Sequence, residues 1–428
     1  MSKGSEAIGR SRREFIGGFT AAALSLTAAE TSLGAAAGCD LRKATLTRVG
    51  SDLQIGDYAE VQGVRAGRFQ PSIWEAGTLH CLFDRRAPVI APAPGRYRNI
   101  YAPTLISEKG GFRVYYGGWD GVPTPNDRVY TQWTRDFRAF EGRELIIDHG
   151  GFIHVNNCSA VRLPTGDFRM MCTAYPDQHG LNKPAAFTSP AGRVWDGSSP
   201  YQPKLSDLIE IKGYPFANAD INGTNAILYE KGWYRLYFAD GHNVGAIFRA
   251  SSRDFKTFSL DGHALTTTHV GVNDVKKFIV NGRKWYVMAL HQNTDRLWYS
   301  LSNDGREFGA VREITANQSQ ADHFIVAVGW VSDAHSIYGF LYGAGPVPTL
   351  DQNQIFAKWL QKRVVFESAS GTIEPEAAIG PNSALLPVSS ADGIDGRFAV
   401  YAEDGNTLLY HGEKVRVHRG EVWRFQVS

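Results

Sequence analysis

The sequence predicts an all-β protein, a five-bladed β-propeller with a small C-terminal β-rich accessory region. Two observations predict this fold. Aromatic residues make up 12% of the 428 residues and glycines number 45, which is typical of a turn-rich β-protein. Five groups of short apolar runs recur between Tyr101 and Phe366 at a spacing of roughly fifty to sixty residues, which favours five blades over six or seven.

The clearest group lies between Asn222 and Phe258. Two apolar runs, Ala226–Tyr229 and Trp233–Phe238, are joined by a Lys-Gly turn and predict a β-hairpin. A third run, Val244–Ala250, and the short segment Thr257–Ser259 follow. Four antiparallel strands in this order are what one propeller blade requires.

The other four groups repeat this order. Their first strands are predicted at Thr104–Ser107, Ser159–Arg162, Val275–Val280 and Phe324–Trp330. Similar short sequences, Thr134-Arg-Asp-Phe137, Ser252-Arg-Asp-Phe255 and Asn303-Asp-Gly305, follow the third run of three groups. Polar residues and glycine in such positions indicate turns.

The chain therefore divides into four segments. Residues 1–37 form a twin-arginine signal peptide, 38–97 an N-terminal β region and linker, 98–367 the propeller, and 368–428 the accessory region. The N-terminal region is expected either to add a strand that closes the ring or to join an accessory sheet. The last sixty or so residues are too few for a large core of their own, so they are expected to pack on the propeller.

The N-terminus carries the most specific local signal. Ser11-Arg12-Arg13-Glu14-Phe15-Ile16 matches the twin-arginine export pattern, and small residues at 35–37 suit a signal peptidase. The sequence therefore predicts a periplasmic or secreted protein, with a lipid anchor at Cys39 as an alternative. Cys158 and Cys172 fall on neighbouring predicted strands, where they either form a disulfide or remain buried, inert thiols.

The charge of the chain excludes some partners. The formal net charge is +2, and lysines and arginines are scattered rather than clustered, so no nucleic-acid partner is expected. After the signal, no stretch has the roughly twenty apolar residues that a membrane helix needs. The number of subunits is left open.

Candidate site residues follow from propeller geometry. The first strand of each blade begins, and the second ends, at the same face beside the axis, so polar residues at these positions converge on one pocket. For catalysis we select the carboxylates Asp120, Asp220 and Asp240, with His154 or His291 as proton donor. For substrate binding we select Arg98, Tyr101, Trp119, Asn157, Asn222, Asn225, His242, Asp274, Asp322 and His323.

The residue types of this set suit an oligo- or polysaccharide. Sugar hydroxyls need Asp, Asn and His partners, and sugar rings stack on Trp or Tyr. Asn and Asp also cap turns at strand ends, so each of them has a purely structural alternative. No cofactor is indicated, although converging carboxylates would also suit a structural Ca²⁺ on the axis.

Two blades resemble the five-bladed propeller glycosidases of glycoside hydrolase families 43, 32, 62, 68 and 117. Tyr101-Ala-Pro-Thr104 with Phe112-Arg-Val-Tyr-Tyr116 is similar to one blade motif of these enzymes, and His154-Val-Asn-Asn-Cys-Ser159 to another. The chain departs from the family pattern at the usual carboxylates, where Asn157 and Thr104 stand, and no Glu occupies a pocket position. The catalytic residues of those families are therefore not transferable.

Three functions remain open at this point. The first is a glycoside hydrolase that uses two carboxylates, or a carboxylate and a histidine. The second is a polysaccharide lyase that acts on a uronate, with His or Tyr as base. The third is a non-catalytic sugar-binding propeller.

Overall fold

The computed structural model describes residues 44–176, 181–222, 226–267, 271–349 and 351–427. The predicted signal peptide, Cys39 and Asn225 lie outside the described residues. Within them, strands dominate, and the α-helix α1 (Pro71–Ala76) is short. No helix of this part of the chain is long and apolar enough to cross a membrane.

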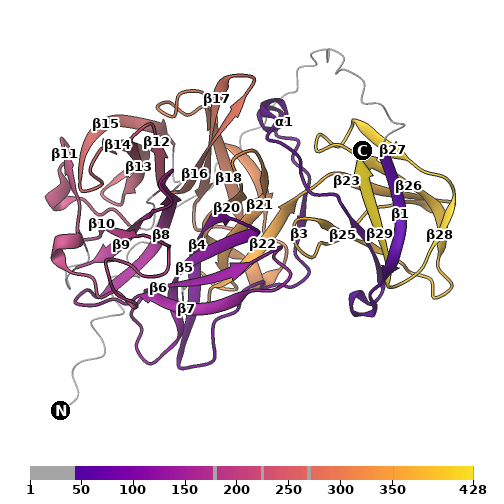
Figure 1. The fold of residues 1–428 in the computed structure, drawn as a ribbon, viewed down its shortest axis with the longest axis horizontal. Helices are drawn as coiled ribbons and strands as arrows, with labels where there is room; N and C mark the ends of the chain where they lie inside the picture. The colour runs from indigo at the N-terminus through magenta and orange to yellow at the C-terminus, as the bar shows by residue number, and fades with distance from the viewer. Residues whose placement is uncertain (1–43, 177–180, 223–225, 268–270, 350, 428) are drawn as a thin grey trace. The chain divides into compact units, whose positions relative to one another are not determined.

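Five sheets follow one another along the chain (Figure 1). The first contains β4 (Tyr97–Glu108), β5 (Gly111–Val122), β6 (Arg128–Thr134) and β7 (Glu141–Ile147). The second contains β8 (His154–Arg162), β9 (Phe168–Tyr175) and β10 (Lys183–Ser189). The third contains β12 (Ala226–Glu230), β13 (Trp233–Asp240), β14 (Asn243–Ser252), β15 (Thr257–Thr266) and, parallel to β15, β11 (Glu210–Lys212).

The fourth and fifth sheets complete this series. The fourth contains β16 (Gly271–Val280), β17 (Arg283–His291), β18 (Arg296–Ser302) and β19 (Arg312–Ala316). The fifth contains β20 (Phe324–Ser332), β21 (Ile337–Gly345), β22 (Gln354–Leu360) and β3 (Cys81–Phe83). β3 comes from the N-terminal region and pairs with β22 through Cys81 and Leu360, so that region adds a strand to the last sheet.

The first strands of the five sheets form a closed cycle. β4 contacts β8, β8 contacts β12, β12 contacts β16, β16 contacts β20, and β20 contacts β4. The predicted propeller fold is thus confirmed. Because each sheet packs between two others, both faces of its middle strands are apolar: β21 is buried along its entire length. This is why the apolar runs in the sequence are continuous rather than alternating.

A hydroxyl-capped turn follows the third strand in four sheets. The hydroxyls of Thr134, Ser189, Ser252 and Ser302 each accept a hydrogen bond, of 2.8 to 3.0 Å, from the backbone N–H three residues later. That third residue has a positive φ in every case, at Phe137, Gly192, Phe255 and Gly305. The two phenylalanines adopt this conformation because their rings are buried in the core. The recurring Thr/Ser-x-Asp sequences are therefore turns, as predicted.

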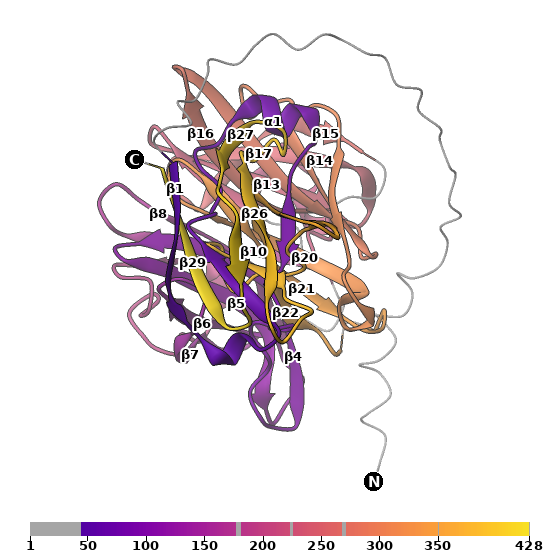
Figure 2. The same ribbon diagram turned by 90° about the vertical axis from the view of Figure 1, so that its right-hand side faces the viewer.

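Two further sheets contain the C-terminal strands, and one of them also contains N-terminal strands. One contains β1 (Ala44–Ser51), β29 (Glu421–Val427), β2 (Tyr58–Gln62) and β25 (Ser383–Pro387), and Figure 2 shows β1 beside β29. The other contains β24 (Gly371–Ile373), β23 (Arg363–Ser368), β26 (Ile394–Tyr401), β27 (Leu408–His411) and β28 (Val415–Val417). The N-terminal region therefore also joins an accessory sheet.

These two sheets share a core with the propeller. Phe398 and Phe425 belong to the same buried cluster as Leu105 and Trp359 of the first and fifth sheets. The buried carboxylate of Asp84 connects the two parts: it accepts hydrogen bonds from the Trp359 indole at 2.8 Å and from the Gly380 backbone at 2.9 Å.

Candidate functional site

The candidate site lies where the first strands begin and the second strands end. Two neighbouring inner strands are irregular there. The register of β4 shifts between Tyr101 and Thr104, and that of β8 between Asn156 and Ser159. Ala102 and Asn157 take positive φ values of 51° and 50° within these bulges. Bulges redirect side chains, and they are frequent near active sites.

The bulges bring three side chains around the buried carboxylate of Asp127, and we call Asp127, Tyr101, Asn156 and His154 the Asp127 cluster. Asp127 has no exposed surface. Its Oδ2 accepts hydrogen bonds from the Tyr101 hydroxyl at 3.0 Å and the Asn156 amide at 2.6 Å. The Asn156 amide also donates to the Tyr101 oxygen at 2.5 Å, and Asn157 donates to Asn156 at 2.8 Å. The cluster therefore joins two neighbouring sheets at one carboxylate.

Two glycines allow the bulged strands to lie where they do. A Cβ at Gly117 would stand 3.0 Å from the Cβ of Asn156, and a Cβ at Gly343 would stand 2.7 Å from the Cβ of Tyr101 and 2.9 Å from its Cα. Real Cβ atoms essentially never make contacts as short as those at Gly343, and the contact at Gly117 is tighter than nine in ten real Cβ contacts. The absence of a side chain at Gly117 and Gly343 thus positions Asn156 and Tyr101.

His154 has a hydrogen-bond partner on Asp127 in either protonation state. Its Nδ1 lies 3.0 Å from the backbone nitrogen of Asp127 and 3.1 Å from the carboxylate Oδ2. A bare Nδ1 accepts from the backbone N–H, and a protonated Nδ1 donates to the carboxylate. When an imidazolium at His154 gives up its Nε2 proton, the remaining Nδ1–H would donate a hydrogen bond to the Asp127 carboxylate. This arrangement suits a proton donor or acceptor, because the carboxylate stabilises the tautomer that such a transfer needs.

Asp220 is bound by Asn182, which lies two strands away from His154 across the second sheet. His154 opposes Tyr175 on β9, and the two rings meet edge to face at 5.1 Å. Asn182 comes just before β10, whose Lys183 opposes Ala174 on β9. The side-chain and backbone N–H groups of Asn182 donate to Oδ1 of Asp220 at 2.5 and 3.0 Å. With strands about 4.8 Å apart, the backbones of His154 and Asn182 are about 10 Å apart.

Asp240 positions the segment that carries Asp220. Its Oδ1 accepts from the backbone N–H groups of Asp220 and His242, both at 2.9 Å. Its Oδ2 accepts from the Tyr214 hydroxyl at 2.8 Å, and burial together with this bond to Asp240 raises the pKa of Tyr214. Asp240 is buried, whereas Asp220 is only partly buried. The structure therefore gives Asp240 an orienting position and leaves Asp220 as the more accessible carboxylate.

Asp120 is held by protein groups on all sides. Its side chain is 1% exposed and forms an ion pair with Arg143 at 2.9 Å. It also accepts from the Tyr116 hydroxyl at 2.9 Å and from the backbone of Ala93 at 2.5 Å. Burial, and then the charge of Asp120, raises the pKa of Tyr116. These contacts are those of a structural carboxylate between β5 and the preceding linker.

His291 is buried at the end of β17. Burial lowers its pKa to about 4, against a smaller opposing effect of a backbone hydrogen bond with Gly271. Its Nδ1 has no hydrogen-bond partner among the described residues. His291 is therefore neutral at neutral pH, which favours His154 over His291 as the proton donor.

The other selected residues divide into buried and exposed sets. Asp274 pairs with Lys276 at 3.1 Å and accepts from the backbone of Trp330 at 3.0 Å. Asp322 caps its own turn and accepts from the Tyr342 hydroxyl at 2.7 Å. Trp119 is buried, with its ring edge to face with Tyr97. The exposed members are Arg98, Asn222, His242 and His323.

Sequence reasoning missed Asp127. This residue precedes the third strand of its sheet, a position outside the two that propeller geometry selects. The polar triplet Asn126-Asp127-Arg128 directly before a buried strand is the local signal that was available. Asn156, beside the selected Asn157, was also left out of the selection.

The cysteines of the second sheet are inert thiols. Cys158 and Cys172 are buried and free, as one of the two alternatives predicted. Burial raises the pKa of Cys158 to about 12, and burial also raises the pKa of Cys172 well above its ordinary value. Over the described ranges, no group of three or more His, Cys, Asp and Glu side chains is placed to hold a metal ion, and the axial Ca²⁺ stays a prediction.

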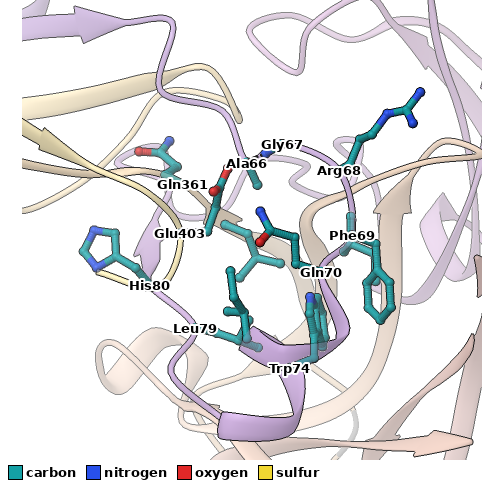
Figure 3. A pocket seen from close by; sticks show the side chains of 13 residues that line it. Ala66, Gly67, Arg68, Phe69, Gln70, Trp74, Leu79, His80, Gln361 and Glu403 are labelled. Atoms are coloured by element: carbon teal, nitrogen blue, oxygen red, sulfur yellow. Dashed lines mark hydrogen bonds between the residues drawn. The ribbon is translucent and has the colours of Figure 1, made fainter. Parts of the chain in front are cut away.

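A small cavity shown in Figure 3 lies away from the Asp127 cluster. It has a volume of about 20 Å³ and lies between the segment around Trp74, the fifth sheet and Glu403. The Nε2 of His80 and the Oε1 of Gln361 line it without a hydrogen-bond partner in the described chain. Its size suits about one water molecule and excludes a sugar.

Comparisons with known proteins give likeness of fold. No protein-family model and no curated protein matches the sequence. A glycosyl hydrolase from Bacteroides ovatus matches with 13% identity and a TM-score of 0.48, over 65% of this chain and 93% of that one. The catalytic domain of a glycoside hydrolase family 62 α-L-arabinofuranosidase from Coprinopsis cinerea has 11% identity and a TM-score of 0.46, over 67% and 98%.

A third solved structure comes from glycoside hydrolase family 130, which contains hydrolases that target β-1,2-mannosidic linkages in Candida mannan. It has 13% identity and a TM-score of 0.47, over 65% of this chain and 93% of that one.

Proposed function

We propose that this protein is a glycosidase, exported by the twin-arginine route, that cleaves a glycosidic bond where the inner strands of the propeller begin. One observation carries the proposal: a wholly buried carboxylate, Asp127, holds a histidine, a tyrosine and an asparagine at the bulged ends of two inner strands. Buried polar clusters of this kind cost stability, and they are typical of sites where chemistry is done.

His154 would supply the proton for the leaving group. Its imidazolium would give the Nε2 proton to the glycosidic oxygen, and the remaining Nδ1–H would stay on the Asp127 carboxylate, 3.1 Å away. Tyr101 and Asn156 donate to the same carboxylate and fix its orientation. Asp127 acts as a positioning residue because it is buried below His154.

Asp220 would supply the carboxylate on the other side of the bond. An oxocarbenium-like transition state needs negative charge or an activated water opposite the proton donor. Asp220 is partly buried, and the Asn182 amide and backbone hold its Oδ1, so the carboxylate is oriented. Because Tyr175 on β9 lies between His154 and Asn182, a sugar that meets both His154 and Asp220 would lie over the end of the second sheet.

The test is product analysis by mass after incubation with a panel of oligosaccharides. Two products whose summed mass exceeds that of the substrate by one water mark hydrolysis, and the rate should fall at least a hundredfold in His154→Gln. The matched control is His335→Gln, because His335 is exposed in the turn between β20 and β21 and was not selected for the site. Absence of any product, or a His154→Gln rate equal to that of His335→Gln, would refute the proposal.

A lyase is the second candidate. The Tyr101 hydroxyl and the His154 imidazole lie on the same carboxylate, which is a pairing of residue types that proton abstraction beside a uronate would use. Arg98 is exposed, and its hydrogen bond to the carbonyl of Pro92 is long, at 3.4 Å, so its guanidinium remains available for an acidic sugar. Products that absorb in the near ultraviolet and show no gain of water would favour elimination.

A further inference from the structure

A second hollow lies on the outer part of the fourth sheet. It has a volume of about 570 Å³ and is lined by Trp285 at the start of β17, by Arg283 and Lys284 beside it, by Asn303 after β18, and by Glu75 of α1. Figures 1 and 2 both show α1 beside β17. The volume lies within the range of about 300–1,000 Å³ that small-ligand sites occupy.

The aromatic ring in this hollow is partly covered. Trp285 is half-buried and packs on the core cluster that contains its cross-strand partner Phe278, and among the described residues it makes no ring-stacking or cation contact. Trp233 shows the contrasting arrangement: it is also half-buried, but the guanidinium groups of Arg253 and Arg235 lie 4.2 and 5.1 Å from its ring centre. Trp285 thus keeps a surface on which a flat apolar face can stack.

The polar groups around Trp285 indicate a neutral ligand. Lys284 is paired with Glu230 at 2.7 Å, and because Lys277 shares this carboxylate at 3.1 Å, the charge of Lys284 is partly compensated. The exposed Arg283 and Glu75 carry opposite charges, and Asn303 adds an amide donor and acceptor. An apolar face surrounded by donors and acceptors of balanced charge matches a neutral sugar ring, whose hydroxyls accept and donate at its edge.

We propose that this hollow is a second binding site for neutral sugars, separate from the Asp127 cluster. Trp285 lies six residues before His291 on β17, which corresponds to about 20 Å along the strand. Trp285 therefore lies at the start of β17, whereas His291 lies at its end, which is the end of the second strands where the candidate site was placed. The site would hold a polysaccharide chain on the protein while cleavage takes place elsewhere, and the choice of sugar as ligand rests on the proposed function.

The experiment is affinity electrophoresis of the full-length protein in gels that contain a soluble neutral polysaccharide: a β-glucan, a mannan or an arabinan. Trp285→Ala should lower the apparent affinity at least tenfold for any polysaccharide that retards the wild type. Trp233→Ala is the matched control and should bind as the wild type does. Because Trp285 also packs partly on the core, the double variant Arg283→Ala/Asn303→Ala, which removes only exposed groups, is measured in parallel and should also bind more weakly.

The outcomes distinguish failure of the second binding site from failure of the proposed catalytic site. Asp127→Asn should bind the gel polysaccharide normally while losing turnover, and Trp285→Ala should retain turnover of a short oligosaccharide. Unchanged retardation of both hollow variants, or no retardation of the wild type by any of the three polymers, would overturn the second site. Either of those results would leave product formation at the Asp127 cluster unaffected.

Discussion

Protonation of His291 should destabilise the folded protein in mildly acidic solution. The ordinary pKa of a histidine is 6.5, and burial lowers that of His291 to about 4. The unfolded chain therefore binds a proton that the folded chain does not bind between these two values. The stability that the neutral, buried imidazole contributes is fully present above pH 6.5 and is lost as the pH falls through 4.

The size of this effect follows from the difference in pKa. A shift of one unit corresponds to about 1.4 kcal/mol, so the loss in unfolding free energy is about 2 kcal/mol at pH 5 and about 3 kcal/mol near pH 4. The effect is large because the side chain is buried and no carboxylate contributes to the shift.

The assay is urea unfolding of the wild type and His291→Gln at pH 7.5, 6, 5 and 4.5. Other groups titrate identically in both proteins, so the difference between the two unfolding free energies isolates His291. That difference should decrease by about 2 kcal/mol from pH 7.5 to 5. A difference that stays constant over this range would refute the burial argument, and with it the reason for preferring His154 to His291 as proton donor.

Three further variants test other parts of the structure. Burial opposes ionisation of Glu230, but hydrogen bonds from Lys284, Tyr286 and Lys277 outweigh burial and lower the pKa of Glu230 to about 2. The wild type should therefore have a higher free energy of unfolding than Glu230→Gln, by an amount that is constant above pH 5 and decreases as the pH falls towards 2. Gly343→Ala should lower the free energy of unfolding in urea by about 1–3 kcal/mol and lower turnover, because the alanine Cβ would displace the Tyr101 backbone. Unfolding and turnover equal to those of the wild type would contradict the packing described for β4. Asp120→Asn should lower the unfolding free energy by about 3 kcal/mol, because Arg143 loses its buried partner; a fully stable but inactive variant would instead indicate a catalytic Asp120.

The strands were predictable because they are apolar on both faces. The run Ala226–Tyr229 became β12, and Trp233–Phe238 became most of β13. The first inner strand was predicted too short, from Thr104 to Ser107, whereas β4 begins at Tyr97. The bulge and the proline between Tyr101 and Thr104 interrupt the apolar pattern there, and only pairing with β5 reveals the longer strand.

The site was less predictable because its contacts are distant in sequence. Asp120 and Asp240 look like reactive carboxylates from their positions, but Arg143 and Tyr214, 23 and 26 residues away, hold them in structural roles. Asp127 looks like an ordinary turn residue, and only the bulges of two separate strands bring Tyr101 and Asn156, 26 and 29 residues away, to its side. The position of a residue relative to the predicted strands indicates on which face of the propeller it lies. That position does not identify which carboxylates on the face are already bound by other protein groups.

The most direct test is the rate at which purified Asp127→Asn turns over an oligosaccharide that the wild type cleaves. The substitution keeps the size of the side chain and its acceptor oxygen, so Tyr101 and Asn156 retain their partner, but it removes the negative charge beside Nδ1 of His154. We predict a folded protein whose turnover is at least a hundredfold slower. Turnover within a few-fold of the wild type would contradict the assignment of the reactive centre to this cluster.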